Sequence, residues 1–82
     1  MPLYMDVHKL GAIDPDALAG AHARDLGVQV RFGVGYRSYW FSQQPARVFC
    51  LVEAPDPDAA AAVHREAHGL VADEIYEVEQ GT

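Results

Sequence analysis

Two segments with the same beginning decide the fold: Asp14-Pro-Asp-Ala-Leu-Ala-Gly-Ala-His22 and Asp56-Pro-Asp-Ala-Ala-Ala-Ala-Val-His64. Each begins with an aspartate that suits a helix N-cap, followed by a proline that suits the first helical turn. The second aspartate of each segment lies in the first helical turn, where its negative charge interacts favourably with the positive end of the helix dipole. The spacing between the two segments also pairs His8 with Cys50. The chain is therefore predicted to contain two similar halves, each built around one helix.

Residue patterns on either side of these helices indicate four β-strands. Residues 3–8 alternate between apolar and polar side chains, and residues 31–42 are rich in aromatic and β-branched side chains. Residues 47–53 are almost continuously apolar, which is typical of a strand in the centre of a sheet. Residues 73–79 carry four acidic side chains, which suits an edge strand.

The predicted order, β-α-β-β-α-β, is that of the ferredoxin-like α+β fold, with residues 1–82 forming a single domain. We expect the first helix to end at Gly27 and the second to continue through His68, before Gly69. In this fold a four-stranded antiparallel sheet carries both helices on one face. We expect the open face to carry Tyr4 and the aromatic residues of the second strand. An open apolar face on a small domain predicts a homodimer packed sheet against sheet.

Composition limits the classes of function and the expected location. The chain has 82 residues and a formal net charge of −6, which argues against nucleic acid as a partner and favours attraction of cations. Cys50 is its only cysteine, so no intrachain disulfide can form. We find neither the basic start and apolar run of a signal peptide nor a membrane-spanning segment. The expected location is therefore cytoplasmic, with no membrane partner.

The strongest candidate for chemistry is the pair His64 and His68, four residues apart just before a glycine. On a helix this spacing places two imidazoles on one face, where they can share one transition-metal ion. The alternative is that both are solvated at a helix end, where histidine gains from the helix dipole. Arg65 occupies the position that the zinc-protease helix motif requires to be glutamate, which excludes that motif.

Three further residues are candidate metal ligands, each with a structural alternative. His22 lies three residues before Asp25. It either forms a hydrogen bond with a nearby acid or carbonyl group, or it belongs to a second metal site. Cys50 lies among apolar neighbours and is either a small buried hydrophobe or a soft ligand close to a histidine. His8 ends the first strand, and it can reach the helix layer only if it does not lie on the open face. The acids Asp6, Glu53, Asp73, Glu74, Glu77 and Glu79 are possible carboxylate ligands or a solvated rim.

Other kinds of site lack support in the sequence. The segment Gly33-Val34-Gly35 lacks the further glycine and the strand-to-helix setting of a phosphate-binding loop. No serine, histidine and acid are suggested as a catalytic group by their positions. The aromatic residues of the second strand suit either the core and a dimer interface or a substrate cage. We therefore expect a binding protein and no enzyme.

Three segments resemble a small bacterial family long described only as a domain of unknown function. They are Met1–His8, Val48–Asp56, and Val63–Leu70 together with Ala72–Ile75. The family includes a nickel-binding, nickel-responsive actinobacterial member. The resemblance implies a ferredoxin-like homodimer that binds nickel(II) and serves in nickel sequestration or detoxification. It points to His8, Cys50, His64 and His68 as motif positions, and His22, the counterpart of His64 in the repeat, is a further candidate.

Two other functions remain as alternatives. The first is a small cofactorless isomerase or monooxygenase, which requires a concave apolar pocket between the sheet and the helices, lined by His22, Tyr39 or Trp40. The second is a purely structural or partner-binding dimer without metal. Residue types do not select the metal, because imidazole suits nickel, copper and zinc alike and intrinsic affinity favours copper.

Overall fold

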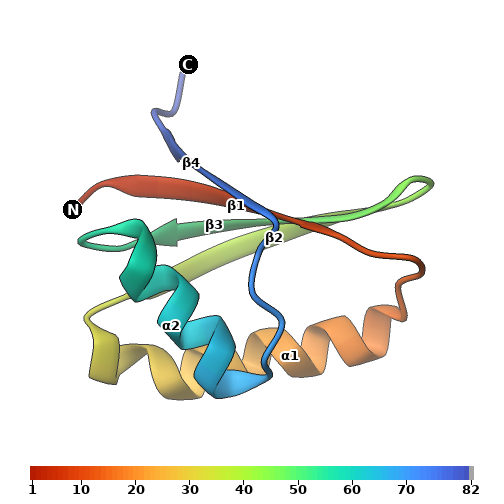
Figure 1. The fold of residues 1–82 in the computed structure, drawn as a ribbon, viewed down its shortest axis with the longest axis horizontal. Coiled ribbons are helices and arrows are strands. Elements are labelled where there is room, and N and C mark those ends of the chain that lie inside the picture. Colours follow the sequence, from red (N-terminus) through yellow and green to blue (C-terminus); the bar gives the residue numbers. More distant parts are fainter. Residues whose placement is uncertain (82) are drawn as a thin grey trace.

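Two helices cover one face of a four-stranded sheet in the structure, a computed structural model that describes residues 1–81 (Figure 1). The strand order is β2-β3-β1-β4, and every neighbouring pair is antiparallel. This confirms the ferredoxin-like α+β fold. The elements in chain order are β1 (Leu3–Lys9), α1 (Pro15–Val28), the 3-10 helix η1 (Gln29–Phe32), β2 (Gly35–Gln43), β3 (Ala46–Glu53), α2 (Pro57–Ala67) and β4 (Glu74–Val78).

Both helices begin where the repeated segments predict. The Asp14 side chain accepts a hydrogen bond from the Asp16 amide at 3.0 Å, and the Asp56 side chain accepts one from the Ala59 amide at 2.8 Å. Each bond satisfies an amide that has no partner within its helix. The repeat therefore fixes the start of each helix through the same local chemistry.

The end of α1 differs from the prediction. Gly27 does not end the helix, which continues to Val28 and then into η1. The chain turns instead at Gly33, whose φ of 66° is favourable only for glycine. The Gln29 side chain accepts a hydrogen bond from the Tyr36 amide at 2.7 Å, which ties this turn to the following strand. Strand β2 consequently begins at Gly35 rather than at residue 31.

The positions of the strands in the sheet agree with their sequence patterns. The apolar strand β3 lies between β2 and β1, and the acidic strand β4 lies at an edge. The core forms between the sheet and the helices around buried side chains of β3 and α2, with Val52, Ala60 and Val63 fully inaccessible to solvent. Within the described residues, no helix has the length and apolar character needed to cross a membrane.

The two faces of β1 are oriented opposite to our expectation. Tyr4 is buried beneath the helices with 6% of its surface exposed, so its expected position on the open face is wrong. Asp6 and His8 share that covered face, where Asp6 contacts both His64 of α2 and its own strand neighbour His8. The open face carries instead a set of apolar side chains that we call the apolar face: Leu3, Met5, Trp40, Phe49, Leu51, Tyr76 and Val78.

Candidate metal centre

His64 lies at the centre of a buried polar cluster between α2, α1 and β1. It is on the face of α2 that packs against the sheet, and only 2% of its surface is exposed. The alternative of a solvated histidine at the helix end therefore does not hold for this residue. Because a buried polar side chain is costly without partners, the contacts of the ring decide what this cluster can do.

Both ring nitrogens of His64 contact carboxylates. Nδ1 lies 2.9 Å from Asp25 Oδ1, and Nε2 lies 3.0 Å from Asp6 Oδ2. Because ionised carboxylates only accept, both nitrogens donate and the ring is an imidazolium. Burial alone would lower the pKa of His64, but the hydrogen bonds to Asp25 and Asp6 outweigh it and raise the pKa to about 9.

Asp6 is 1% exposed and has a different environment at each oxygen. Oδ2 accepts hydrogen bonds from His64 and from the Tyr36 hydroxyl, the latter at 2.9 Å. Oδ1 is buried without a hydrogen-bond partner among the described residues, although His8 Nε2 lies 3.2 Å away. Burial disfavours the charged form of Asp6, but the interactions with His64 and His8 outweigh burial and lower its pKa.

His68 caps the end of α2 and joins the cluster from the loop side. Its Nδ1 accepts a hydrogen bond from the Leu70 amide at 3.1 Å, and its Nε2 lies 3.1 Å from Asp25 Oδ1. Gly69, with a φ of 81°, makes the turn that brings Leu70 back to this ring. Burial lowers the pKa of His68, so the ring is neutral, with its proton on Nε2.

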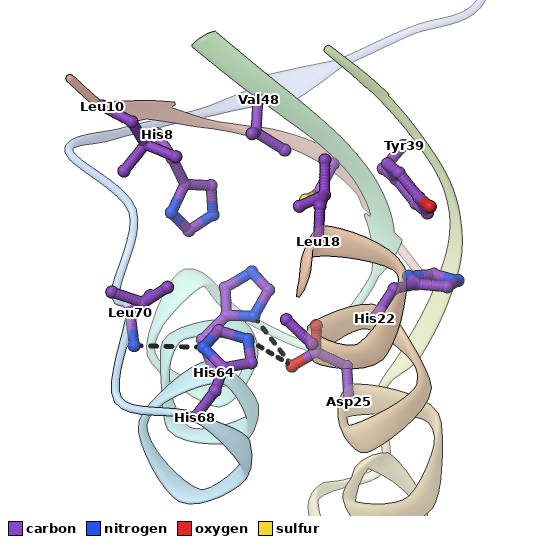
Figure 2. Close-up of a pocket in the computed structure, with 12 residues that line it drawn as sticks. His8, Leu10, Leu18, His22, Asp25, Tyr39, Val48, His64, His68 and Leu70 are labelled. Atoms are coloured by element: carbon purple, nitrogen blue, oxygen red, sulfur yellow. Dashed lines mark hydrogen bonds and ion pairs between the residues drawn. The ribbon is translucent and has the colours of Figure 1, made fainter. Parts of the chain in front are cut away.

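A small cavity adjoins this cluster. Its volume is about 40 Å³, which accommodates an ion or a few water molecules. Figure 2 shows the rings of His8, His64 and His68 directed toward this region, with Asp25 reaching in from α1. The cavity is lined by His8, Leu10, Leu18, Ala21, His22, Asp25, Tyr39, Val48, Cys50, His64, His68 and Leu70.

Two sets of side chains are arranged as possible metal ligands, and they share His64. The outer set is Asp25, His64 and His68, and the inner set is Asp6, His8, Cys50 and His64. Within each set the donor atoms lie within 4.8 Å of one another. In the outer set Asp25 Oδ1 is 2.9 Å and 3.1 Å from the two ring nitrogens. Ligands that bind one ion at right angles at about 2.1 Å lie about 3 Å apart, so the outer spacing fits a metal ion.

The structure brings the four motif positions, His8, Cys50, His64 and His68, to one cavity, and it places His22 at the side of that cavity, outside both ligand sets. Figure 2 shows His22 beside Tyr39, on the far side of Leu18 from the other histidines. The two rings are 4.8 Å apart, and His22 belongs to neither ligand set of the described residues. It lines the cavity and is only partly buried.

The structure also shows the contacts of several acidic residues whose role the sequence does not decide. Asp73 accepts a hydrogen bond from the Lys9 amide at 2.6 Å, and Glu74 lies 3.4 Å from the Lys9 side chain, so both serve the end of the sheet. Asp25, by contrast, is 3% exposed and contacts two histidines. The sequence contains one signal for it: Asp25 follows Leu18 by seven residues and Ala21 by four, so helical spacing places it on the same face of α1 as these two residues.

The comparisons with known proteins identify the family and a solved structure with the same fold. A family described as nickel responsive protein SCO4226-like matches residues 4–78. Among solved structures, that of SCO4226 from Streptomyces coelicolor A3(2) is similar, with a TM-score of 0.89 and 36% sequence identity. That similarity covers 98% of this chain and 99% of the other chain. No curated protein matches this chain.

Proposed function

The chain belongs to the SCO4226-like family of nickel-responsive proteins, and on this premise we propose that it binds nickel(II) through Asp25, His64 and His68. The single observation that carries the proposal is the convergence of three donor atoms on one buried point, at distances that fit an ion. Two imidazoles and a carboxylate suit nickel(II), with water completing the coordination. We propose further that the bound ion is cargo, held for nickel sequestration or detoxification.

Charge supports binding of a divalent ion at this place. In the structure the two buried carboxylates, Asp6 and Asp25, face a single imidazolium, His64, which leaves one negative charge uncompensated. A divalent ion that replaces the Nδ1 proton of His64 brings the cluster to neutrality. The free energy of ion binding is thus favoured by removal of a buried charge. The net charge of −6 also attracts cations toward the protein.

The volume of the cavity favours an ion over an organic substrate. The alternative of a cofactorless isomerase or monooxygenase needs a pocket of about 300 Å³ or more. The cavity beside His22 and Tyr39 has about 40 Å³, and Trp40 lies on the opposite face of the sheet. Turnover of a small carbonyl or phenolic substrate by the metal-free protein would be the result that favours the enzyme.

We also propose that the protein is a homodimer formed through the apolar face. Leu3, Met5, Trp40, Leu51 and Val78 border a hollow of about 410 Å³ on this side of the sheet. Trp40 and Tyr76 remain 53% and 52% exposed. Glu79 and Gln80 also border the hollow. Contact between two equal apolar faces removes these apolar side chains from water, which favours an isologous dimer. Sedimentation analysis of wild type and Trp40→Glu tests this, and we expect a dimer and a monomer, respectively.

Calorimetric titration with nickel tests the proposed site. We expect the wild type to bind one ion per chain at the site and His68→Gln to lose at least ~100-fold in affinity, since removal of a ligand costs more than removal of a supporting residue. His22→Gln is the matched control, because it changes the same residue type on α1, and we expect it to bind as the wild type does. Equal affinity of wild type and His68→Gln would refute the assignment.

A further inference from the structure

We propose that the inner set, Asp6, His8, Cys50 and His64, is a separate site for a thiophilic, four-coordinate divalent ion such as zinc, and that this ion excludes nickel by competing for the His64 ring. The site itself rests on its own geometry. Only the competition rests on the proposed function.

The inner set has the composition of a closed zinc site. It offers one sulfur, two imidazole nitrogens and one carboxylate oxygen, all within 4.8 Å of one another. Zinc favours four such ligands in tetrahedral geometry, and a site with four protein ligands needs no water. All four residues are buried, and the outer set differs in offering only three protein ligands. Nickel(II), which favours more ligands including water, suits the outer set better.

The orphaned oxygen of Asp6 is independent evidence for a ligand at this place. Oδ1 is on a side chain 99% buried, and no described residue donates a hydrogen bond to it. His8 Nε2, another member of the set, lies 3.2 Å from this oxygen. A buried carboxylate oxygen without a partner is costly, and a cation held between Asp6 and His8 removes that cost.

Cys50 gives the inner set its selectivity. A cysteine thiol keeps its proton at neutral pH unless a metal or a nearby cation stabilises the thiolate, so the buried, free Cys50 is protonated without a metal. An ion must therefore bind sulfur strongly enough to displace this proton, which favours zinc and disfavours hard ions such as magnesium. The same protonation makes Cys50 a poor nucleophile and leaves metal binding as its chemistry.

Protons and charges balance at both sites but in different numbers. Zinc at the inner site displaces the Cys50 thiol proton and the His64 Nε2 proton, and the ring keeps donating Nδ1–H to Asp25. Two protons leave as two positive charges arrive, so the buried net charge does not change. Nickel at the outer site releases the His64 Nδ1 proton, and the His68 ring stays neutral by moving its proton from Nε2 to Nδ1, which gives up the hydrogen bond from the Leu70 amide. A neutral imidazole has one lone pair, so the two ions compete for one ring.

Cobalt(II), a coloured stand-in for zinc, tests the inner site in the unmodified protein. We expect a thiolate-to-cobalt charge-transfer band in the near ultraviolet and intense visible bands of tetrahedral cobalt, both removed by added zinc. Because Cys50 is the only cysteine, the charge-transfer band can arise from no other residue. A cobalt complex without this band would overturn the proposal.

Two variants separate the sites. We expect Cys50→Ser to lose the charge-transfer band and at least ~10-fold in zinc affinity while it keeps nickel binding, and His68→Gln to keep the band. Calorimetry in two buffers should give two protons released per zinc ion. Normal zinc binding without nickel binding would refute the proposed function and leave the inner site standing. Nickel binding without zinc binding would refute the inner site and leave the proposed function standing. Simultaneous binding of both ions at full affinity would refute the competition between them.

Discussion

His64 and His22 hold equivalent positions in the two halves of the repeat, yet their surroundings are opposite. His64 is 2% exposed and lies between two carboxylates, whereas His22 is partly buried and lies beside the tilted ring of Tyr39. Both helices begin with the same aspartate-proline-aspartate motif. The difference shows that local chemistry sets where a helix begins, while packing against the sheet decides which of its histidines becomes part of a site.

The largest expected contrast is in stability. His64→Ala leaves Asp6 and Asp25 buried without their cationic partner, so we expect a loss of about 3–5 kcal/mol in the free energy of unfolding. His22→Ala removes one aromatic contact with Tyr39, and we expect a loss of about 1 kcal/mol. Urea denaturation of metal-free protein measures both. Equal losses would mean that the two histidines are equivalent after all.

The second contrast is in the pH dependence of stability. The pKa of His64 is raised from 6.5 to about 9 on folding. Because the pKa of His64 is higher in the folded protein than in the unfolded chain, its protonation stabilises the folded state. This stabilisation is complete at pH values below the pKa of the unfolded chain, and it is lost as the pH rises through the pKa of the folded protein. Unfolding free energy of the metal-free protein should therefore fall by roughly 2–3 kcal/mol between pH 6.5 and about 9. His22→Gln should show the same decrease in the free energy of unfolding over this pH range. The same decrease in a His64→Gln variant would contradict its assignment to His64.

The fold was accessible from the sequence because it depends on signals that are local. Asp14 and Asp56 act through bonds within their own helix, and the apolar run of β3 reports its own central position. The error at Gly27 has a similar basis, because a glycine signals a helix end only when the chain needs a positive φ there. In this protein Gly33 supplies it.

The site was accessible only in part. The spacing of His64 and His68 indicates a shared helix face, and the repeat draws attention to His22. Asp25 could not be assigned, because its bond to His64 joins residues far apart in the sequence. The orientation of β1 was also hidden, since alternation separates the two faces of a strand without saying which one the helices cover.

The third contrast is in proton release. Nickel binding at the outer set requires the His64 Nδ1 proton to leave, so about one proton should be released per ion at pH 7. A site made of a neutral imidazole such as a surface histidine releases none. Nickel titrations in two buffers with different ionisation enthalpies give this number. The value should be unchanged in His22→Gln, and release of no proton would exclude His64 from the site.

The smallest expected effect comes from making the two helices more alike. Leu26 occupies the place in the first half that His68 occupies in the second, and it is 43% exposed. In a His68→Gln background, Leu26→His creates a second histidine pair with His22, but without a buried acid between them. We expect the new pair to bind nickel at least ~10-fold more weakly than the wild-type site. Nickel titration measures this, and full recovery of affinity would show that spacing alone makes the site.

The most direct test of the account is a crystal of the protein soaked in nickel, with anomalous scattering measured at the nickel absorption edge. We expect a peak among Asp25, His64 and His68, and no comparable peak beside His22. A dominant peak beside His22 and Tyr39, or at the acidic edge strand, with none near His64, would contradict it.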